Sequence, residues 1–445
     1  MAEVFPSTPQ APGLPETLAT IVKWRDIPTP MTEEDFSSAM EELSAIVTYL
    51  SDKTDRPSRS ALAMARLVLG NLHRDHGMID HATPFYDAAL ENPSDLDDGT
   101  PHGKNELANT YTHRGLCTMT GGDEESLKSA MGDFDRAIVI RKSLPLEDDE
   151  AFRWGLGNSL INRGDLLHRI GDRNEEARNA YDEAIEQLKQ LPVQENPAAL
   201  QRLALATANR GLVADDHAES RRYFEECIEL LPSPANPAQM LTLCTALLNR
   251  GRHSLQVIDD TNATAADARK VLALLEQHER NHPAPAEIAM QARHLLAHSL
   301  CAWLDDSRKG PGLEEDWISD ATDAVEEGLA VERFWEQQGF EGLRPLAAEL
   351  FQLGLHIYRV RQPHFFAEFL VESMDPESSP GAPFTDPRFQ TAAGHALRQA
   401  VNDSTQRATA SGLDSGRVQK EAKILDSLQK ADQRLAALQE QTAEV

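Results

Sequence analysis

Small and apolar residues recur along most of the chain at spacings of three and four, which is the period of an amphipathic α-helix. The clearest case is a stripe of a small, an aromatic and a second small residue at Ala177, Tyr181 and Ala184. Related stripes are Ala82-Tyr86-Ala89, Ala130-Phe134-Ala137, Ser220-Phe224-Cys227 and Ala268-Leu272-Leu275. Such a stripe predicts a helix that lets a second helix approach closely beside its small residues. Alternating runs of Val, Ile and Thr, typical of strands, do not occur.

A helical segment that contains a glycine precedes each stripe, and these glycines fall 45, 49, 47 and 40 residues apart. They are Gly70, Gly115, Gly164, Gly211 and Gly251. A glycine within a helix costs about 1 kcal/mol relative to alanine, so its recurrence indicates a packing gain where two helices cross. Turn residues such as Gly121-Gly122 and Gly171-Asp172 separate the glycine segment from the stripe. Each unit of the pattern is therefore predicted to be a helical hairpin.

This pattern resembles the tetratricopeptide repeat (TPR) superfamily. The shared features are the glycine of the first helix, the turn glycine, the small-aromatic-small stripe and a closing proline, as at Gly77, Gly171, Pro93, Pro192 and Pro232. Residues 162–185 match best, and the resemblance covers about residues 61–276. The period exceeds the usual value of about 34, the early tryptophan is missing, and no turn glycine follows Gly251. The resemblance implies an all-α, right-handed superhelical solenoid of TPR-like hairpins with extra C-terminal helices.

The ends of the chain differ from its middle. Residues 1–30 hold six prolines without periodicity, which predicts a disordered or loosely packed leader. The solenoid is expected over residues 31–375, with the best repeats at 61–276 and degenerate repeats at 285–375, followed by a linker at 376–388. Residues 389–445 predict further helices, the second with Ile424, Leu428, Ala431, Leu435 and Leu438 in heptad spacing. Residues 424–438 either cap the solenoid or form a homo-oligomer, and we favour capping because terminal repeats need a cover.

The charge of the chain limits the classes of partner that it can bind. With 72 acidic and 43 basic residues, the net charge is −29, which excludes nucleic acid and anionic lipid in the absence of a local basic cluster and favours a basic partner. The start of the chain lacks the pattern of a secretory signal, and no stretch is apolar over the length of a membrane span. Four scattered cysteines form no CxxC motif. We therefore expect a cytoplasmic protein.

Three asparagines stand at the same point of the repeat, two residues before the glycine: Asn162, Asn209 and Asn249. The TPR resemblance implies that this point faces the concave groove, where an amide can bond the main chain of an extended peptide because it both donates and accepts. Asn158 lies one helical turn before Asn162. The alternative is that these asparagines are solvent-exposed and bind nothing.

An arginine precedes four of the five repeat glycines, at Arg114, Arg163, Arg210 and Arg250, whereas Leu69 precedes Gly70. We expect Arg114, Arg163 and Arg210 to form ion pairs within their own hairpins, with Asp135, Asp182 and Glu225, which follow the aromatic residues. The alternative is contact with a partner, since a guanidinium can bind a carboxylate through two hydrogen bonds. The arginines are therefore groove candidates beside the asparagines.

Catalytic and metal-binding motifs are weak. His278, His282, His294, His298 and Cys301 have spacings of three and four that zinc ligands on helices could use, but there is no HExxH and we expect no metal and no cofactor. A nucleophile elbow, a P-loop and a complete dinucleotide fingerprint are absent from the sequence. The helices expected to line the groove lack the lysines of a two-carboxylate clamp. We therefore expect a non-enzymatic protein.

The sequence predicts a protein–protein interaction scaffold or adaptor that binds a peptide or helix, basic in character, in a concave groove. Two alternatives remain open: a self-assembling structural protein, and a regulatory subunit of a separately encoded enzyme.

Overall fold

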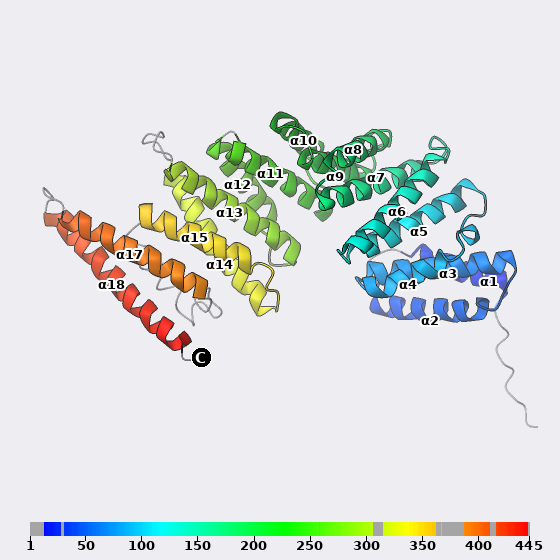
Figure 1. The fold of residues 1–445 in the computed structure, drawn as a ribbon, viewed down its shortest axis with the longest axis horizontal. Coiled ribbons are helices and arrows are strands. Elements are labelled where there is room, and N and C mark those ends of the chain that lie inside the picture. Colours follow the sequence, from blue (N-terminus) through cyan, green and yellow to red (C-terminus); the bar gives the residue numbers. More distant parts are fainter. Residues whose placement is uncertain are drawn as a thin grey trace, which may run out of the picture. The chain divides into compact units, whose positions relative to one another are not determined.

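The computed structural model describes residues 13–27, 31–257, 259–305, 315–361, 366, 387–409 and 415–443. The chain divides into two compact units, Met1–Asp215 and Asp216–Val445, called here the first and second unit. The described residues form α-helices and one short 3-10 helix, Pro93–Asp95, and contain no strand (Figure 1). The predicted all-α class is confirmed.

The first unit is built from helical hairpins that stack in chain order. Its helices are α1 (Leu14–Arg25), α2 (Glu33–Leu50), α3 (Arg56–Asp75), α4 (Ile79–Ala89), α5 (Pro101–Met119), α6 (Glu124–Lys142), α7 (Glu150–Ile170), α8 (Asn174–Leu188) and α9 (Pro197–Leu212). The tightest packing is within the hairpins α3–α4, α5–α6 and α7–α8. Each second helix also contacts the next first helix, and successive first helices contact one another. This is the packing predicted for a solenoid of hairpins.

The repeat glycines mark the helix crossings. A Cβ atom at Gly70, Gly115 or Gly164 would lie 2.7, 2.8 or 2.6 Å from the ring of Tyr86, Phe134 or Tyr181, respectively. These contacts are too short for any side chain, so only glycine lets the aromatic ring of the second helix reach the first helix. The predicted role of these three glycines is confirmed.

The turn glycines adopt backbone conformations that other residues avoid. The φ angles of Gly77, Gly122 and Gly171 are +73°, +75° and +91°. Gly171 follows α7 directly and ends it in the left-handed conformation, with its N–H bonded to the carbonyl oxygen of Leu167. The turn of each of these hairpins is therefore specified by a residue that the sequence had already singled out.

Part of the predicted leader is folded. Residues 14–25, expected to be disordered or loosely packed, form α1, so the prediction was wrong for this segment. Ile21 and Trp24 are buried against the apolar residues of α2, and the Trp24 indole Nε1 donates to Glu42 at 2.7 Å. Pro15 stands in the first turn of the helix, where proline is tolerated because the first N–H groups have no partner within the helix. Residues 1–12 and 28–30 of the predicted leader lie outside the described residues.

The second unit continues the helical pattern. Its helices are α10 (His217–Leu230), α11 (Pro237–Val257), α12 (Thr261–Leu275), α13 (Pro283–Asp305), α14 (Glu315–Gln337), α15 (Arg344–Arg361), α17 (Pro387–Thr409) and α18 (Ser415–Ala443). Here the crossings use other residues. A Cβ atom at Gly251 would lie 3.0 Å from the Leu295 side chain of α13 instead of an aromatic ring of its own hairpin. A buried ion pair at 2.6 Å joins Arg293 of α13 to Glu279, which follows α12.

The C-terminal helices form a hairpin. Ile424, Leu428, Ala431 and Leu435 of α18 are buried, α18 packs on α17, and α17 also contacts α15. These four residues of the heptad stripe are thus packed inside the chain, which supports capping over self-association through 424–438. The side chain of Leu438 and residues 376–386 of the predicted linker lie outside the described residues.

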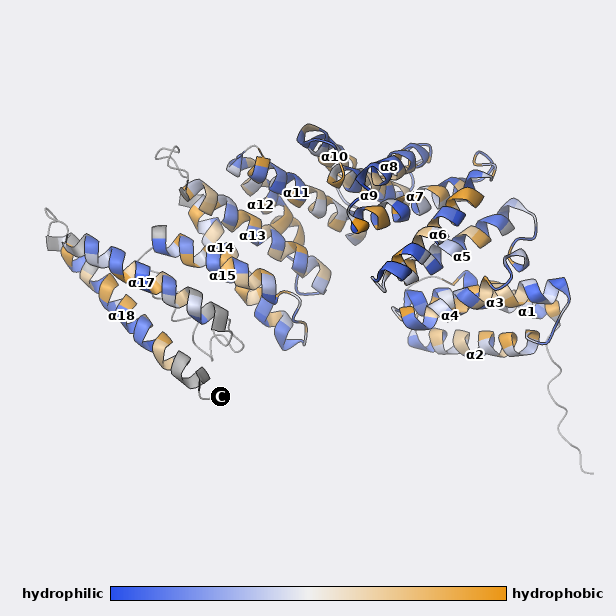
Figure 2. Cartoon of the chain, viewed as in Figure 1, coloured by the Kyte–Doolittle hydropathy of each residue, from blue (hydrophilic) through white to orange (hydrophobic). Residues whose placement is uncertain are grey.

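Apolar and polar residues alternate along the helices, as expected of amphipathic helices with one packed face (Figure 2). Among the described helices, none combines the length and the apolar character needed to cross a membrane.

Candidate binding surface

The first helices of successive hairpins in the first unit are joined by polar side chains. The hydroxyl groups of Thr112 on α5 and Ser159 on α7 are 3.0 Å apart. Asn209 on α9 donates through Nδ2 to Asp165 on α7 at 2.8 Å. The residues around these links include five asparagines, and we call the surface that they form the asparagine face: Asn105 and Asn109 on α5, Asn158 and Asn162 on α7, and Asn209 on α9.

Two asparagines of this face have unused hydrogen-bonding groups. Asn158 and Asn162 are half-buried, and neither side chain bonds to another described residue. The Oδ1 atom of Asn158 is fully buried without a partner. Trp154, also half-buried, precedes Asn158 by one turn and therefore lies on the same stripe of α7. Buried amide groups are nearly always hydrogen-bonded, so an unpaired amide oxygen at Asn158 is unusual and marks this stripe as a candidate binding surface.

On α5 the residue two positions before the repeat glycine is His113, where α7 carries Asn162. The Nδ1 atom of His113 is buried and has no hydrogen-bond partner among the described residues. Burial holds the pKa of His113 well below its usual range, so the imidazole is neutral. A second unsatisfied polar group therefore lies at this repeat position.

Asp165 is the acidic centre of the asparagine face. Its Oδ1 atom accepts the Tyr181 hydroxyl at 2.6 Å and the Asn209 amide at 2.8 Å. Burial raises the pKa of Asp165, while these two hydrogen bonds act in the opposite direction. Asn71, at the same place in α3, accepts the Tyr86 hydroxyl at 2.9 Å.

A buried arginine lies between α5 and α7. Arg141, at the end of α6, is 2% exposed. Its Nε donates to Asn105 at 3.3 Å, one terminal nitrogen donates to Thr112 at 2.9 Å and to Ser159, and the other donates to Asn109. All four acceptors are neutral. Burial lowers the pKa of Arg141 to about 10.

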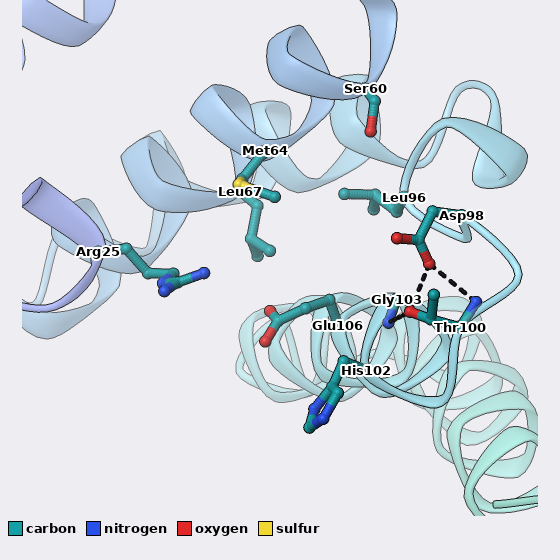
Figure 3. A pocket seen from close by; sticks show the side chains of 10 residues that line it. All are labelled: Arg25, Ser60, Met64, Leu67, Leu96, Asp98, Thr100, His102, Gly103 and Glu106. Atoms are coloured by element: carbon teal, nitrogen blue, oxygen red, sulfur yellow. Dashed lines mark hydrogen bonds between the residues drawn. The ribbon is translucent and has the colours of Figure 1, made fainter. Parts of the chain in front are cut away.

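A cavity lies against the first turns of α5. It has a volume of about 520 Å³ and lies between α1, α3 and α5. Arg25 and Glu106 point into it from different helices (Figure 3). Asp98 beside it accepts the N–H and hydroxyl of Thr100, and Thr100 in turn caps α5. Glu106, which lines the cavity, follows Asn105 and precedes Asn109 by three residues on α5. The cavity is therefore close to the two asparagines that bind Arg141.

The arginines predicted for the groove are used in ion pairs, but not with the expected partners. Arg163 contacts Asp135 at 2.7 Å and Arg210 contacts Asp182 at 2.8 Å. Arg114 contacts Asp87 at 3.0 Å. Each of these acidic residues belongs to the preceding hairpin, so the predicted pairs Arg114–Asp135 and Arg163–Asp182 were wrong. The predicted partner of Arg210, Glu225, belongs to the second unit and bonds Arg221.

The geometry of a helix explains the shift by one hairpin. Successive residues are rotated by about 100° around a helix, so a residue next to the glycine cannot face the same neighbour as the glycine. Gly164 faces Tyr181 of its own hairpin, and Arg163 consequently faces α6 of the preceding one. Three arginines also bind an acidic residue of their own hairpin, as predicted in kind, namely Arg114 with Asp133 at 2.7 Å, Arg163 with Glu176 at 3.4 Å and Arg250 with Asp267 at 2.6 Å.

The remaining predicted asparagines differ in their use. Asn209 is held by Asp165, as described above. Asn249 belongs to the second unit, where its Oδ1 accepts from Arg252 at 3.0 Å. Of the proposed ladder, Asn162 and its neighbour Asn158 are therefore the rungs with free amide groups.

Asn105, Asn109, Ser159 and Arg141 were not predicted as site residues. The signal for the first two was present, because Asn105 and Asn109 are four residues apart on α5, as are Asn158 and Asn162 on α7. Arg141 carried no such signal, since a basic residue at the end of a helix is ordinary.

The histidine cluster does not form a metal site. His294 and His298 are neighbours, with ring centroids 5.7 Å apart, and His294 lies 3.3 Å from Glu349. His282 accepts the backbone N–H of Ala284, and the Cys301 thiol lies 3.9 Å from the Leu353 carbonyl oxygen. Over the described part of the chain, which includes all five candidates, no three His, Cys, Asp or Glu side chains are placed to hold a metal ion.

No protein-family model and no curated protein matches the chain. Similar solved structures include BtubC (BKLC) from P. vanneervenii, with 18% identity and a TM-score of 0.44 over 56% of this chain and 93% of that chain. A Rap protein complexed with competence and sporulation factor has 15% identity and a TM-score of 0.42 over 97% and 99%. A circular tandem repeat protein with a novel repeat topology has 14% identity and a TM-score of 0.31 over 97% and 100%. From its own hairpins and their packing, the chain is a helical-repeat protein.

Proposed function

We propose that the chain is a non-catalytic binding protein of the TPR type that holds an extended peptide segment on the asparagine face of the first unit. The observation that carries this proposal is the pair Asn158 and Asn162, whose amides lie one turn apart on α7 without hydrogen-bond partners. A scaffold or adaptor needs such a surface and no reacting group.

The spacing of the asparagines fits a peptide backbone. Residues four apart on a helix are displaced by about 6 Å along its axis. In an extended peptide, groups on the same side recur every two residues, or about 6.6 Å. Asn158 and Asn162 can therefore contact successive main-chain groups, and Asn105 and Asn109 repeat the arrangement on α5. Since an amide both donates and accepts, such contacts depend little on the side chains of the peptide.

The charge of the chain bears on the kind of peptide. A net charge of −29 attracts a partner of net positive charge over long distance. Asp165 of the face and Glu106 of the adjoining cavity carry carboxylates that favour a cationic side chain. We therefore propose a segment that is basic as a whole.

The test is the capture of a synthetic random-sequence peptide library by the immobilised protein, with bound peptides quantified by mass spectrometry. We expect Asn158→Ala combined with Asn162→Ala to remove most of the capture, because these side chains have no structural bonds to lose. The matched control is Asn179→Ala on α8, which replaces an exposed asparagine of the same unit.

Unchanged capture by the double variant, with the same unfolding midpoint as the original protein, would exclude the asparagine face as the binding element. A loss that also occurs in the control variant would show that capture depends on the general surface.

A further inference from the structure

We propose that Arg141 is the anchor for a carboxylate of the bound peptide segment, at the place where the Asn109 amide now contacts the guanidinium. This inference rests on the proposed function and adds a chemical requirement to it: the segment, although basic as a whole, carries an acidic group at one defined point.

The first observation is that the charge of Arg141 has no bonded counter-ion. The guanidinium makes hydrogen bonds to two amides and two hydroxyls, as described above, and to no carboxylate. A guanidinium has five N–H groups, so these four contacts leave one N–H of the Asn109-bound nitrogen free. Removing a cation from water without pairing it is costly, and neutral acceptors recover only part of that cost.

The second observation is that the surroundings are shaped around the guanidinium. A Cβ atom at Gly155 on α7 would lie 2.6 Å from the Nε atom of Arg141, so any larger residue there would require the guanidinium to move. Ser159, one turn later on α7, contributes a buried hydroxyl. The site therefore draws residues from α5, α6 and α7, as a built binding site does.

The third observation concerns access. Asn109 is half-buried and belongs to the asparagine face, whereas Thr112 and Ser159 are buried beneath it. The amides of Asn105 and Asn109 are thus the outer contacts, and Asn109 is bonded to the nitrogen that carries the free N–H, so Asn109 is the contact that a ligand can replace. A carboxylate in its place would form a charge-assisted, two-pronged contact, which is about twice as strong as the neutral bond it displaces.

Glu106 of α5 is the carboxylate whose charge acts on Arg141. This charge favours the protonated form and so raises the pKa of Arg141, against the larger effect of burial. Glu106 forms no hydrogen bond with the guanidinium, and it also acts on Arg25 in the cavity. Its charge is therefore divided between two arginines, and the counter-charge for Arg141 remains incomplete.

The direct test uses sodium acetate as the probe, with acetamide as the neutral control of the same shape and sodium chloride as the control for ionic strength. The readout is the NMR signal of the Arg141 Nε–H group, assigned by its loss in Arg141→Lys. We expect a saturable shift with acetate and none with the two controls. No shift with acetate, or an equal shift with chloride, would overturn the proposal.

A second test avoids any dependence on the folding of an Arg141 variant. Asn109→Asp places a carboxylate on the guanidinium from within the protein, so we expect a higher unfolding midpoint and loss of the acetate response. Asn179→Asp is the matched control, since Asn179 is an exposed asparagine of α8 outside the asparagine face, and it should keep the acetate response. Retention of the full response in Asn109→Asp would contradict the proposed location.

The source of the carboxylate follows from peptide libraries with free and with amidated C-termini. Enrichment of Asp or Glu in both libraries indicates an acidic side chain, whereas capture of the free-acid library alone indicates the chain terminus. Capture of peptides that depends on the asparagines but shows no preference for an acidic group would support the proposed function and contradict the role of Arg141. Binding of acetate at Arg141 without capture of any peptide would contradict the proposed function instead.

Discussion

Arg163 forms its ion pair with Asp135 of the preceding hairpin, with Nε and Oδ1 2.7 Å apart. Arg210 and Asp182 repeat this relationship one hairpin later at 2.8 Å, and Arg114 and Asp87 show it one hairpin earlier. Arg114, Arg163 and Arg210 thus connect hairpins, while Gly115 and Gly164 close the crossing within their own hairpins.

This connection can be measured by double-mutant cycles. We expect a coupling of about 0.5 to 1 kcal/mol between Arg163→Ala and Asp135→Ala, the range of a partly exposed ion pair. Arg163→Ala and Asp182→Ala, which the sequence alone would pair, should be additive. The free energy of unfolding in urea gives both numbers. A larger coupling to Asp182 than to Asp135 would refute the register.

The glycine crossing predicts opposite effects for two glycine-to-alanine changes. Gly164→Ala places a methyl group against the Tyr181 ring and should destabilise the first unit by about 1 to 3 kcal/mol through overpacking. Gly132→Ala is the control, because a Cβ atom there meets only Arg136, at 3.9 Å.

Gly132→Ala should stabilise α6 by about 0.5 to 1 kcal/mol, the gain in helix propensity. Thermal unfolding of both variants should show a lower midpoint for Gly164→Ala and a higher midpoint for Gly132→Ala than for the original protein. Stabilisation by Gly164→Ala would show that the helices can move apart without cost.

Glu332 in α14 predicts a pH dependence of the second unit. Burial, with a smaller effect from Glu336, raises the pKa of Glu332 from an ordinary value of 4.5 to about 7. The folded state therefore binds this proton more tightly than the unfolded state. The corresponding stabilisation is complete below the unfolded pKa and is lost as the pH rises through about 7.

We expect the stability of the second unit to decrease by about 2 kcal/mol between pH 4.5 and 7 for this reason. Glu332→Gln should flatten the profile in this window, as measured by urea unfolding at several pH values. A profile that is the same for both proteins would assign the effect to other groups.

Leu428 tests the role of α18. Its side chain is fully buried in the C-terminal hairpin, so Leu428→Asp should expose α17 and lower the unfolding midpoint, with a cost of about 3 kcal/mol or more. Light scattering should give the same mass for the variant and the original protein at low concentration. A protein that changes from a defined oligomer to a monomer would favour self-association over capping.

The hairpin architecture was predictable because it depends on local patterns. The stripe at Ala177, Tyr181 and Ala184 and the glycine at 164 report a contact within one hairpin, which sequence spacing encodes directly. The helix α1 was missed because six prolines outweighed the short apolar spacing of Ile21 and Trp24. Proline content was a poor guide there, since Pro15 occupies a position that helices accept.

The site was predictable only in part. The asparagines could be found because they repeat, and Asn158 and Asn162 remain the residues with free amides. The ion-pair partners of the arginines could not be predicted. Each residue along a helix is rotated by about 100° from the one before, so a shift of one position decides which neighbouring hairpin an arginine faces, and the sequence has acidic residues in both hairpins. Arg141 escaped notice since its importance comes from burial among neutral acceptors, which no local pattern records.

The ion pairs between hairpins also bear on how such an array can grow. Each of the three aromatic residues Tyr86, Phe134 and Tyr181 is followed by an aspartate, and each next hairpin offers an arginine before its glycine. A duplicated hairpin would therefore meet a matching charge on both sides without any new substitution. The same arginine–aspartate pair can join any two successive hairpins of this kind. Gene duplication could therefore lengthen the array one hairpin at a time while every intermediate remained folded.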